Sequence, residues 1–267
     1  MITLDIQGHI AHIKLDRPEK LNAMNWDFWQ GMPGIIDKVN ADFNVRAAVL
    51  YGEGKAFSVG LDVFDVIPRL GVTGTGPDGE RQRKLHQIIR DMQWTATCVE
   101  RCRVPVIAAV TGMCLGGAID LITACDLRVA SKDAVFGVRE TKMAIVADIG
   151  TLQRLPRVIA PGIARELVYT GRDFDANYAA QIGLVNTVFQ DRDDAINGAL
   201  AIAEEIAANA PLAVQGSKQV MNESSSRDID RELEYVATWN AAHLMSQDLG
   251  HAIECFATKT TPNFQGK

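Results

Sequence analysis

The sequence predicts an α/β core followed by a helical C-terminal region. Short apolar runs typical of strands alternate with segments of helical periodicity through the first two thirds of the chain, and the last third is mainly helical. No fixed repeat and no linker divides the chain into similar units. We therefore predict a core domain over residues 1–200 and a C-terminal helical region over residues 201–267.

The composition favours a globular protein with a small-molecule ligand. The chain has 267 residues and 47% hydrophobic content, which is enough apolar material for one large core. Its net charge of −6 gives no basic field for a polyanion, so nucleic acid is not an expected partner. The odd number of cysteines, five, does not form a secreted disulfide framework.

The chain shows no sign of a membrane or export segment. The N-terminal stretch alternates like a strand, and no apolar run approaches the roughly 18 to 20 residues that cross a bilayer. The C-terminal PNFQGK is not a recognisable peroxisomal address. We predict a cytoplasmic location and no membrane partner.

The first elements are two strands, a helix and a third strand. Residues 2–7 and 9–15 are typical of strands around Gly8, and Asn25 is a good N-cap for the helix that follows. Gly31, Pro33 and Gly34 interrupt this helix, which predicts a kink or two pieces. The buried strand RAAVLYG at residues 46–52 precedes GEGKAFSVGLD, which we interpret as a glycine-punctuated loop leading into a site.

The middle of the chain carries a strand, a glycine pair and a helix in that order. Residues 71–80 are rich in turn formers and predict a mobile excursion, and residues 81–102 follow helical spacing. VPVIAAVTG then predicts a buried strand, and AIDLITAC predicts a helix that begins beside Gly116 and Gly117. LRVAS and AVF predict two more short strands before the helical remainder.

Backbone N–H groups around these glycines are candidate donors to a developing negative charge. The first N–H groups of a helix are unpaired and partly positive, so Gly117 is the first candidate donor. The loop at Gly60 and Leu61 offers a second. The alternative is that the glycine pair only makes a tight turn.

Three acidic residues near the glycine pair are candidate proton carriers. Asp120, Glu140 and Asp148 have apolar neighbours, which raise carboxyl pKa values toward neutrality. Taken singly, each has a structural alternative. Asp120 can offset the helix dipole, Asp148 can cap a helix and Glu140 can be a solvated surface acid.

Other chemistries find little support. Neither a phosphate loop nor a dinucleotide fingerprint is present, and Ser58 lacks the G-x-S-x-G elbow of hydrolases. Cys98 and Cys102 are one helical turn apart, but no second ligand pair at metal-binding spacing accompanies them. We expect no metal.

AFSVGLD followed by MCLGGAIDLITACDLRVAS resembles the two oxyanion-loop motifs of the crotonase, or enoyl-CoA hydratase/isomerase, superfamily. The resemblance covers nearly the whole chain. It implies a spiral of ββα units, a C-terminal helical region that trimerises, and a homo-trimer or homo-hexamer. The expected substrate is an acyl-CoA thioester, which carries its own coenzyme A, so no further cofactor is expected.

Within that superfamily, Asp120, Glu140 and Asp148 resemble the three acidic positions of the Δ3,5-Δ2,4-dienoyl-CoA isomerases. This resemblance implies that Glu140 is the base at C2, that Asp148 is the acid at C6 and that Asp120 tunes them. The N–H groups of Leu61 and Gly117 would hold the thioester oxygen. Glu140 would then begin ionised and Asp148 protonated.

The resemblance also implies contacts to coenzyme A. It points to the backbone along Ala56, Ser58 and Leu61, to Arg17 and Lys20 near the phosphates, and to Lys259 for the ligand of a neighbouring subunit. Ordinary solvated side chains are an equal alternative for Arg17 and Lys20.

Two other functions stay open on the sequence. An enoyl-CoA hydratase would use Asp120 and Glu140 to position and activate water. Typical hydratases resemble this chain in the glycine loops, but they carry glutamate where Asp120 stands and generally lack an acid equivalent to Asp148. A noncatalytic acyl-CoA-binding protein would keep the fold without the chemistry.

Overall fold

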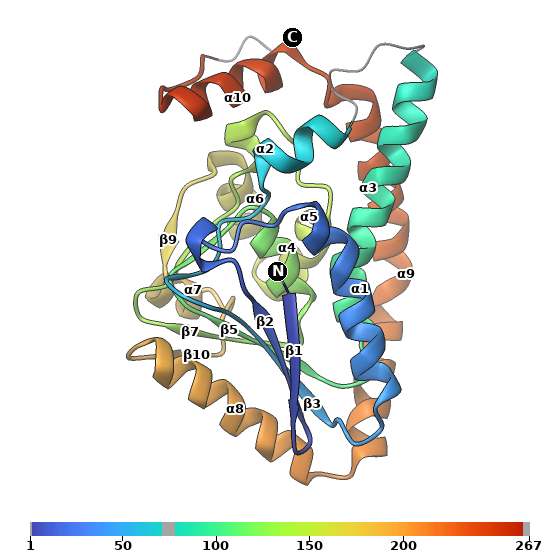
Figure 1. Ribbon diagram of the computed structural model, residues 1–267, viewed down its shortest axis with the longest axis vertical. Helices are drawn as coiled ribbons and strands as arrows, with labels where there is room; N and C mark the ends of the chain where they lie inside the picture. Colours follow the sequence, from blue (N-terminus) through green and yellow to red (C-terminus); the bar gives the residue numbers. More distant parts are fainter. Residues whose placement is uncertain (1, 71–77, 264–267) are drawn as a thin grey trace.

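The structure is a computed structural model that describes residues 2–70 and 78–263. Most of the predicted excursion at residues 71–80 lies outside the described residues. The rest of the chain forms two sheets with helices around them (Figure 1). In the described residues, no helix is long and apolar enough to cross a membrane.

The larger sheet has six strands in the order β1-β2-β3-β5-β7-β10. Only β1 runs antiparallel to its neighbour, and the other pairs are parallel. Parallel strands buried on both faces are continuous apolar runs, which is why residues 46–52 and 104–112 were recognisable in the sequence. The strands are β1 (Ile2–Gln7), β2 (Ile10–Leu15), β3 (Ala47–Gly52), β5 (Val106–Val110), β7 (Leu127–Ser131) and β10 (Thr187–Phe189).

The smaller sheet is made of the short strands that follow the main ones. Its order is β4 (Ala56–Ser58), β6 (Met113–Leu115), β8 (Val135–Gly137) and β9 (Phe174–Asp175). Strand pairs β3-β4, β5-β6 and β7-β8 each lead into a helical segment, which is the predicted succession of ββα units. Strand β4 lies in the stretch that we predicted as a loop, and that prediction was wrong because a three-residue strand has no readable alternation.

Helices cover the sheets on several sides. In Figure 1, α8 (Arg192–Ala208) crosses beneath the main sheet, and α3 (Asp78–Glu100) runs beside α9 (Pro211–His243). Helix α10 (Gln247–Thr258) lies above α2 (Val63–Val66). The remaining helices are α1 (Trp26–Ala41), α4 (Gly117–Ala124), α5 (Thr151–Val158), α6 (Pro161–Thr170) and α7 (Ala176–Gln181), with 3-10 turns η1 (Pro18–Lys20), η2 (Ile67–Leu70) and η3 (Glu140–Met143).

Helix α1 begins as predicted but is not divided. The Asn25 side chain accepts a hydrogen bond from the Phe28 N–H at 3.2 Å, which confirms the N-cap. The helix continues through Pro33, so the expectation of two pieces was wrong. Proline has no N–H for the Trp29 carbonyl one turn back, and the Thr95 hydroxyl of α3 donates to that carbonyl at 2.9 Å instead.

The C-terminal helices follow α8 without a separate sheet. The predicted boundary after residue 200 lies within α8, and buried alanines of this helix pack on the main sheet. The division into a core and a C-terminal region stays a prediction.

Candidate active site

A cavity of about 790 Å³ lies between the loop after β4, the start of α4, the turn η3 and helix α10. Its walls are mostly apolar, and charged residues and two glycines interrupt them. The acidic residues are Asp62, Asp120, Glu140 and Asp148, and the basic ones are Lys20, Arg139 and Lys142. Apolar residues that line it include Leu61, Ile67, Leu70, Ile89, Met92, Ile149, Leu244 and Phe256. A large apolar cavity with a few polar groups is the usual form of a small-molecule site.

Two glycines bring the loop after β4 and the start of α4 into contact. Gly60 has φ +86, and a Cβ at this position would lie 2.5 Å from Leu115 O and 3.1 Å from Gly117 N. Gly116 has φ +54 and directly precedes α4. Any side chain at Gly60 would push the two segments apart, so their close approach depends on glycine there.

This approach places two N–H groups side by side at the cavity. Leu61 and Gly117 both line it, and neither N–H has a hydrogen-bond partner among the described residues. Leu61 N lies 3.8 Å from the point where a Cβ on Gly117 would sit. Two unpaired donors, one of them at a helix N-terminus, form an anion-stabilising pair of the oxyanion-hole type. The predicted pair of donors is therefore together in the fold.

Asp120 lies in the first turn of α4 and is 2% exposed. Its Oδ1 accepts a hydrogen bond from the Thr151 N–H at 2.6 Å. Burial raises the pKa of Asp120 to about 6, although the hydrogen bond from Thr151 and the charge of Arg154 act in the opposite direction. Asp120 thus joins the start of α4 to the start of α5.

Glu140 is the first residue of the turn η3. The residue is half-buried, yet its Oε2 is sealed from solvent and has no hydrogen-bond partner among the described residues. Burial, followed by the negative charges of Asp120 and Asp148, raises the pKa of Glu140 to about 8. The alternative of a solvated surface acid is therefore wrong.

Asp148 is placed just before α5 and is half-buried. Its Oδ2 accepts a hydrogen bond from Asn240 Nδ2 at 2.6 Å. Burial raises the pKa of Asp148 to about 7, and the nearby charge of Asp120 adds to the effect, while the Asn240 bond opposes it. Gly150 occupies the N-cap position of α5, so the alternative that Asp148 is a helix cap was wrong.

The three acids therefore line one cavity, as the sequence predicted. Their pKa values all move toward neutrality because burial disfavours the charged carboxylates. In the described part of the chain, no group of three or more histidine, cysteine or acidic side chains has the geometry of a metal site. The arrangement is suited to moving protons beside a stabilised anion.

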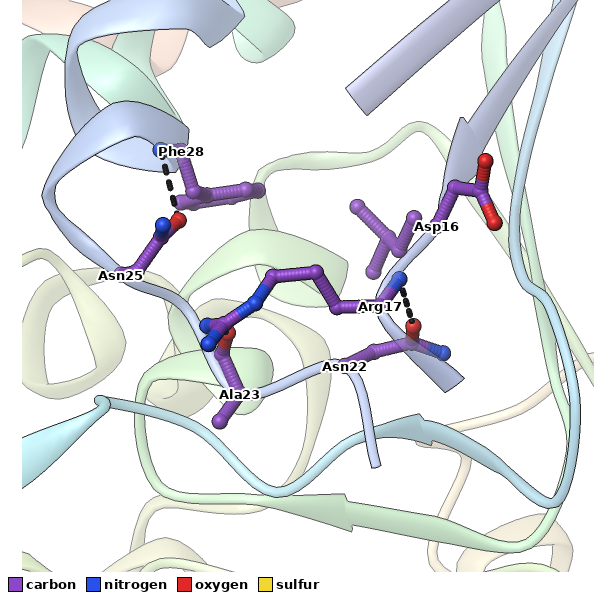
Figure 2. A pocket seen from close by; sticks show the side chains of 7 residues that line it. Asp16, Arg17, Asn22, Ala23, Asn25 and Phe28 are labelled. Carbon is purple, nitrogen blue, oxygen red and sulfur yellow. Dashed lines mark hydrogen bonds between the residues drawn. The ribbon is translucent and has the colours of Figure 1, made fainter. Parts of the chain in front are cut away.

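The two basic residues assigned to the coenzyme A phosphates, Arg17 and Lys20, lie in different places. Lys20 is exposed and lines the cavity. Arg17 lies in a small separate pocket with Asn22 and Asn25 (Figure 2). Its guanidinium donates to Ala23 O at 2.7 Å and pairs with Asp62 at 3.1 Å. Arg17 thus ties the segment after β2 to the loop after β4.

Ala56 and Ser58 lie in β4, the strand that leads into the loop of Leu61. Both are buried in β4 and do not line the described cavity. Ser58 Oγ accepts a hydrogen bond from the Gly60 N–H at 3.1 Å and donates to Asn22 O at 2.8 Å. Lys259 is exposed at the end of α10, next to Thr260, which lines the cavity.

Several residues around the site were not assigned from the sequence. The Trp29 ring lies beside Gly117, and its Nε1 donates to Met24 O at 3.1 Å. The rings of Phe64 and Phe256 meet with centroids 5.9 Å apart where α2 lies below α10. Asn240 is 92 positions away from Asp148, so no local pattern could have revealed their contact.

The comparisons with known proteins agree with this geometry. The family model described as enoyl-CoA hydratase/isomerase matches residues 5–267. The mitochondrial Delta(3,5)-Delta(2,4)-dienoyl-CoA isomerase of Mus musculus is 40% identical over 258 residues, which are 95% of this chain and 78% of that protein. The peroxisomal Delta(3,5)-Delta(2,4)-dienoyl-CoA isomerase of Arabidopsis thaliana is 40% identical over 265 residues, or 99% and 95% of the two chains.

A solved structure gives the same answer for the fold. The crystal structure of a carnitinyl-CoA hydratase from Mycobacterium avium matches with a TM-score of 0.86 and 30% identity, covering 100% of this chain and 98% of that one. Since the family model spans nearly the whole chain and the relatives match over its length, this protein belongs to the enoyl-CoA hydratase/isomerase family and has its crotonase-type fold.

Proposed function

We propose that this enzyme converts a 3,5-dienoyl-CoA to the conjugated 2,4-dienoyl-CoA. The observation that carries the proposal is the third acid, Asp148, which lines the same cavity as Glu140 and the two N–H donors. Two relatives at 40% identity are named as isomerases of this kind. A hydratase has no evident use for a second proton carrier at this place.

In the proposed reaction, Glu140 removes a proton from C2 of the thioester. The negative charge spreads over the dienolate, and the Leu61 and Gly117 N–H groups stabilise it on the thioester oxygen. Double bonds then form at C2–C3 and C4–C5 while Asp148 delivers a proton to C6. One proton leaves and one is added, so the substrate gains and loses no electrons.

The raised pKa values suit this exchange. Burial raises the pKa values of Glu140 and Asp148 to about 8 and about 7, so each carboxyl can hold or release a proton near neutral pH. The forward reaction starts with Glu140 ionised and Asp148 protonated, and the two residues exchange these roles in the reverse direction.

Ultraviolet absorbance tests the proposal directly. We expect the purified protein to produce the absorbance of a conjugated 2,4-dienoyl thioester from 3,5-dienoyl-CoA. Removing either proton carrier, in Glu140→Gln or Asp148→Asn, should reduce this rate by at least about 100-fold. No absorbance change with the wild-type protein would refute the proposal.

The hydratase alternative predicts the opposite effect of one substitution. Hydration of 2-enoyl-CoA would need Asp120 and Glu140, and Asp148→Asn should then leave most of the activity. Hydration without conjugation would identify a hydratase. Binding of acyl-CoA without either reaction would identify a noncatalytic protein.

Three further features belong to the proposal. Lys20 at the cavity supports binding of a coenzyme A phosphate, and we assign no other cofactor. Exposed apolar side chains along α9 support a homo-trimer or homo-hexamer. The cytoplasm stays the predicted location, although the two relatives described above are named as mitochondrial and peroxisomal.

A further inference from the structure

Asp148 is held by two amide side chains that come from different helices. Asn240 on α9 is 1% exposed and Gln93 on α3 is 2% exposed. Gln93 Nε2 donates to the Asp148 backbone carbonyl at 2.7 Å and to Leu233 O at 3.0 Å. Asn240 Nδ2 donates to Asp148 Oδ2 at 2.6 Å and to Val146 O at 2.7 Å.

The two contacts of Asn240 determine which way its amide faces. Val146 O is a carbonyl oxygen and can only accept, so the group beside it must be the NH₂ of Asn240. The second hydrogen of that NH₂ points to Asp148 Oδ2. Both hydrogens are used, and the amide has no freedom to turn without leaving a buried carbonyl unpaired.

This bond makes the two oxygens of Asp148 unequal. Oδ2 is an acceptor from Asn240, and a proton on Oδ2 would face an N–H instead of a lone pair. Oδ1 accepts no hydrogen bond from another side chain among the described residues, and Asp148 lines the cavity. The oxygen that can take and release a proton is therefore Oδ1.

We propose that Asn240 is a positioning residue that fixes the Asp148 carboxyl through Oδ2, so that Oδ1 is the atom that exchanges a proton with the substrate. This inference rests on the proposed function for its catalytic meaning. It also makes α9, a helix outside the ββα core, a part of the site. Gln93 holds only the backbone of Asp148 and does not distinguish the two oxygens.

The groups facing Asp148 define what a substitution should change. Asp120 on α4 and Glu140 on η3 supply negative charge, while α3 and α9 face it with the uncharged amides of Gln93 and Asn240. Asn240 is thus the side chain that stabilises the ionised form of Asp148 by a hydrogen bond. Its removal should raise the pKa of Asp148, because the ionised carboxylate loses this hydrogen bond while the two neighbouring negative charges remain.

The experiment uses Asn240→Leu, which keeps the approximate shape without the donor, and Asn240→Asp, which places a second carboxyl against Oδ2. The control is Thr238→Ala, an exposed position on α9 whose hydroxyl donates only to Glu234 O of its own helix. Thermal unfolding of each variant checks the fold. The reaction is then run in deuterium oxide. Deuterium exchange at C2 measures proton removal by Glu140, and deuterium incorporation at C6 measures proton delivery by Asp148.

We expect Asn240→Leu to slow incorporation at C6 by at least about tenfold and to change exchange at C2 by less than about threefold. The pH window of isomerisation should move up by about one unit, and further in Asn240→Asp. Thr238→Ala should behave as wild type. A general loosening of the fold would slow deuterium exchange at C2 and deuterium incorporation at C6 together, and it would leave the pH window of isomerisation unchanged. That result would overturn the inference.

Titration of the Asp148 carboxyl by ¹³C NMR, in the protein without substrate, separates this inference from the proposed function. An upward shift in Asn240→Leu, which adds no charge, supports the hydrogen bond even if no dienoyl-CoA is isomerised. An unchanged titration in a folded variant overturns the inference even if the wild-type enzyme is an efficient isomerase.

Discussion

Glu140 differs from the other two acids because one oxygen of its carboxyl group is buried without a hydrogen-bond donor among the described residues. Asp120 accepts from Thr151 and Asp148 accepts from Asn240, whereas Glu140 Oε2 is buried without a partner in the described structure. A buried oxygen without a donor disfavours the ionised carboxylate and so makes it a stronger base. The same property must weaken the folded protein whenever Glu140 is ionised.

We expect the free energy of unfolding to fall as the pH rises from about 4 to about 8. The pKa of Glu140 is raised from 4.5 to about 8 in the folded protein, so folding binds a proton in this interval. Its contribution to stability is complete below the unfolded pKa and is lost as the pH rises through the folded value. Asp120 and Asp148, with pKa values raised to about 6 and about 7, act in the same direction.

Urea unfolding of wild type and Glu140→Gln at pH 5 and pH 9 measures this effect. The variant has no charge to bury, so it should be more stable than wild type at pH 9, by on the order of 2 kcal/mol. At pH 5 the two proteins should differ little. Equal stabilities at pH 9 would mean that Glu140 is solvated when ionised.

At the scale of elements, the site depends on the contact between the loop after β4 and the start of α4. Gly60 is the point of contact, and its backbone conformation and its distance from Leu115 O both require glycine. The Leu61 N–H follows directly after it in the chain. A change at Gly60 should therefore disturb the anion-stabilising pair before it disturbs the core.

We predict that Gly60→Ala lowers kcat for isomerisation by on the order of 100-fold, which is the usual cost of losing one such donor. The matched control is Gly8→Ala in the turn between β1 and β2. Gly8 also has positive φ, +59, but no atom lies within 4 Å of its Cβ position. Both variants place an alanine at positive φ, but only the alanine at position 60 meets neighbouring backbone atoms. Equal activities of the two variants would argue against the Leu61 N–H as a donor.

The elements around the site differ in how far the sequence revealed them. The strand, glycine pair and helix from Val106 to Ala124 were predicted, because a buried parallel strand and a glycine turn leave local patterns. Strand β4 and the turn η3 were missed, since three or four residues carry no periodicity. The roles of the acids came from a resemblance, and spacing alone left each of them with a structural alternative.

The contacts of Asn240 and Gln93 could not be predicted from the sequence, for a different reason. Both side chains act across the fold, at 92 and 55 positions from Asp148. An amide on a helix has the same local pattern whether it faces solvent or a buried carboxyl. Only the packing of α3 against α9 and of both against the segment before α5 decides between these cases.

At the scale of the whole molecule, α9 faces two environments. It packs along α3 (Figure 1) and reaches Asp148, and it also exposes large apolar side chains. These exposed residues are Leu212, Val220, Met221, Tyr235 and Trp239. Side chains of this kind are typical of a surface that is covered by another protein chain.

We predict that the wild-type protein is a trimer or hexamer by light scattering and that Val220→Glu combined with Tyr235→Glu produces a monomer. Both side chains are 70% exposed, so the fold should remain, with unchanged helix content by circular dichroism. Glu204→Lys on the exposed side of α8 is the control and should not change the mass. A monomeric wild-type protein would contradict the predicted assembly.

Pro33 and Thr95 restrict the order in which this sequence can diverge. The Thr95 hydroxyl occupies the carbonyl of Trp29 that Pro33 leaves without an N–H, and Trp29 in turn lies beside Gly117. A lineage that lost Thr95 first would pass through a protein with a buried unpaired carbonyl, at a cost of about 1–3 kcal/mol. A lineage that first replaced Pro33 by alanine would regain the backbone donor and could then change Thr95 freely. Homologues are therefore expected to have lost both residues or Pro33 alone, and seldom Thr95 alone.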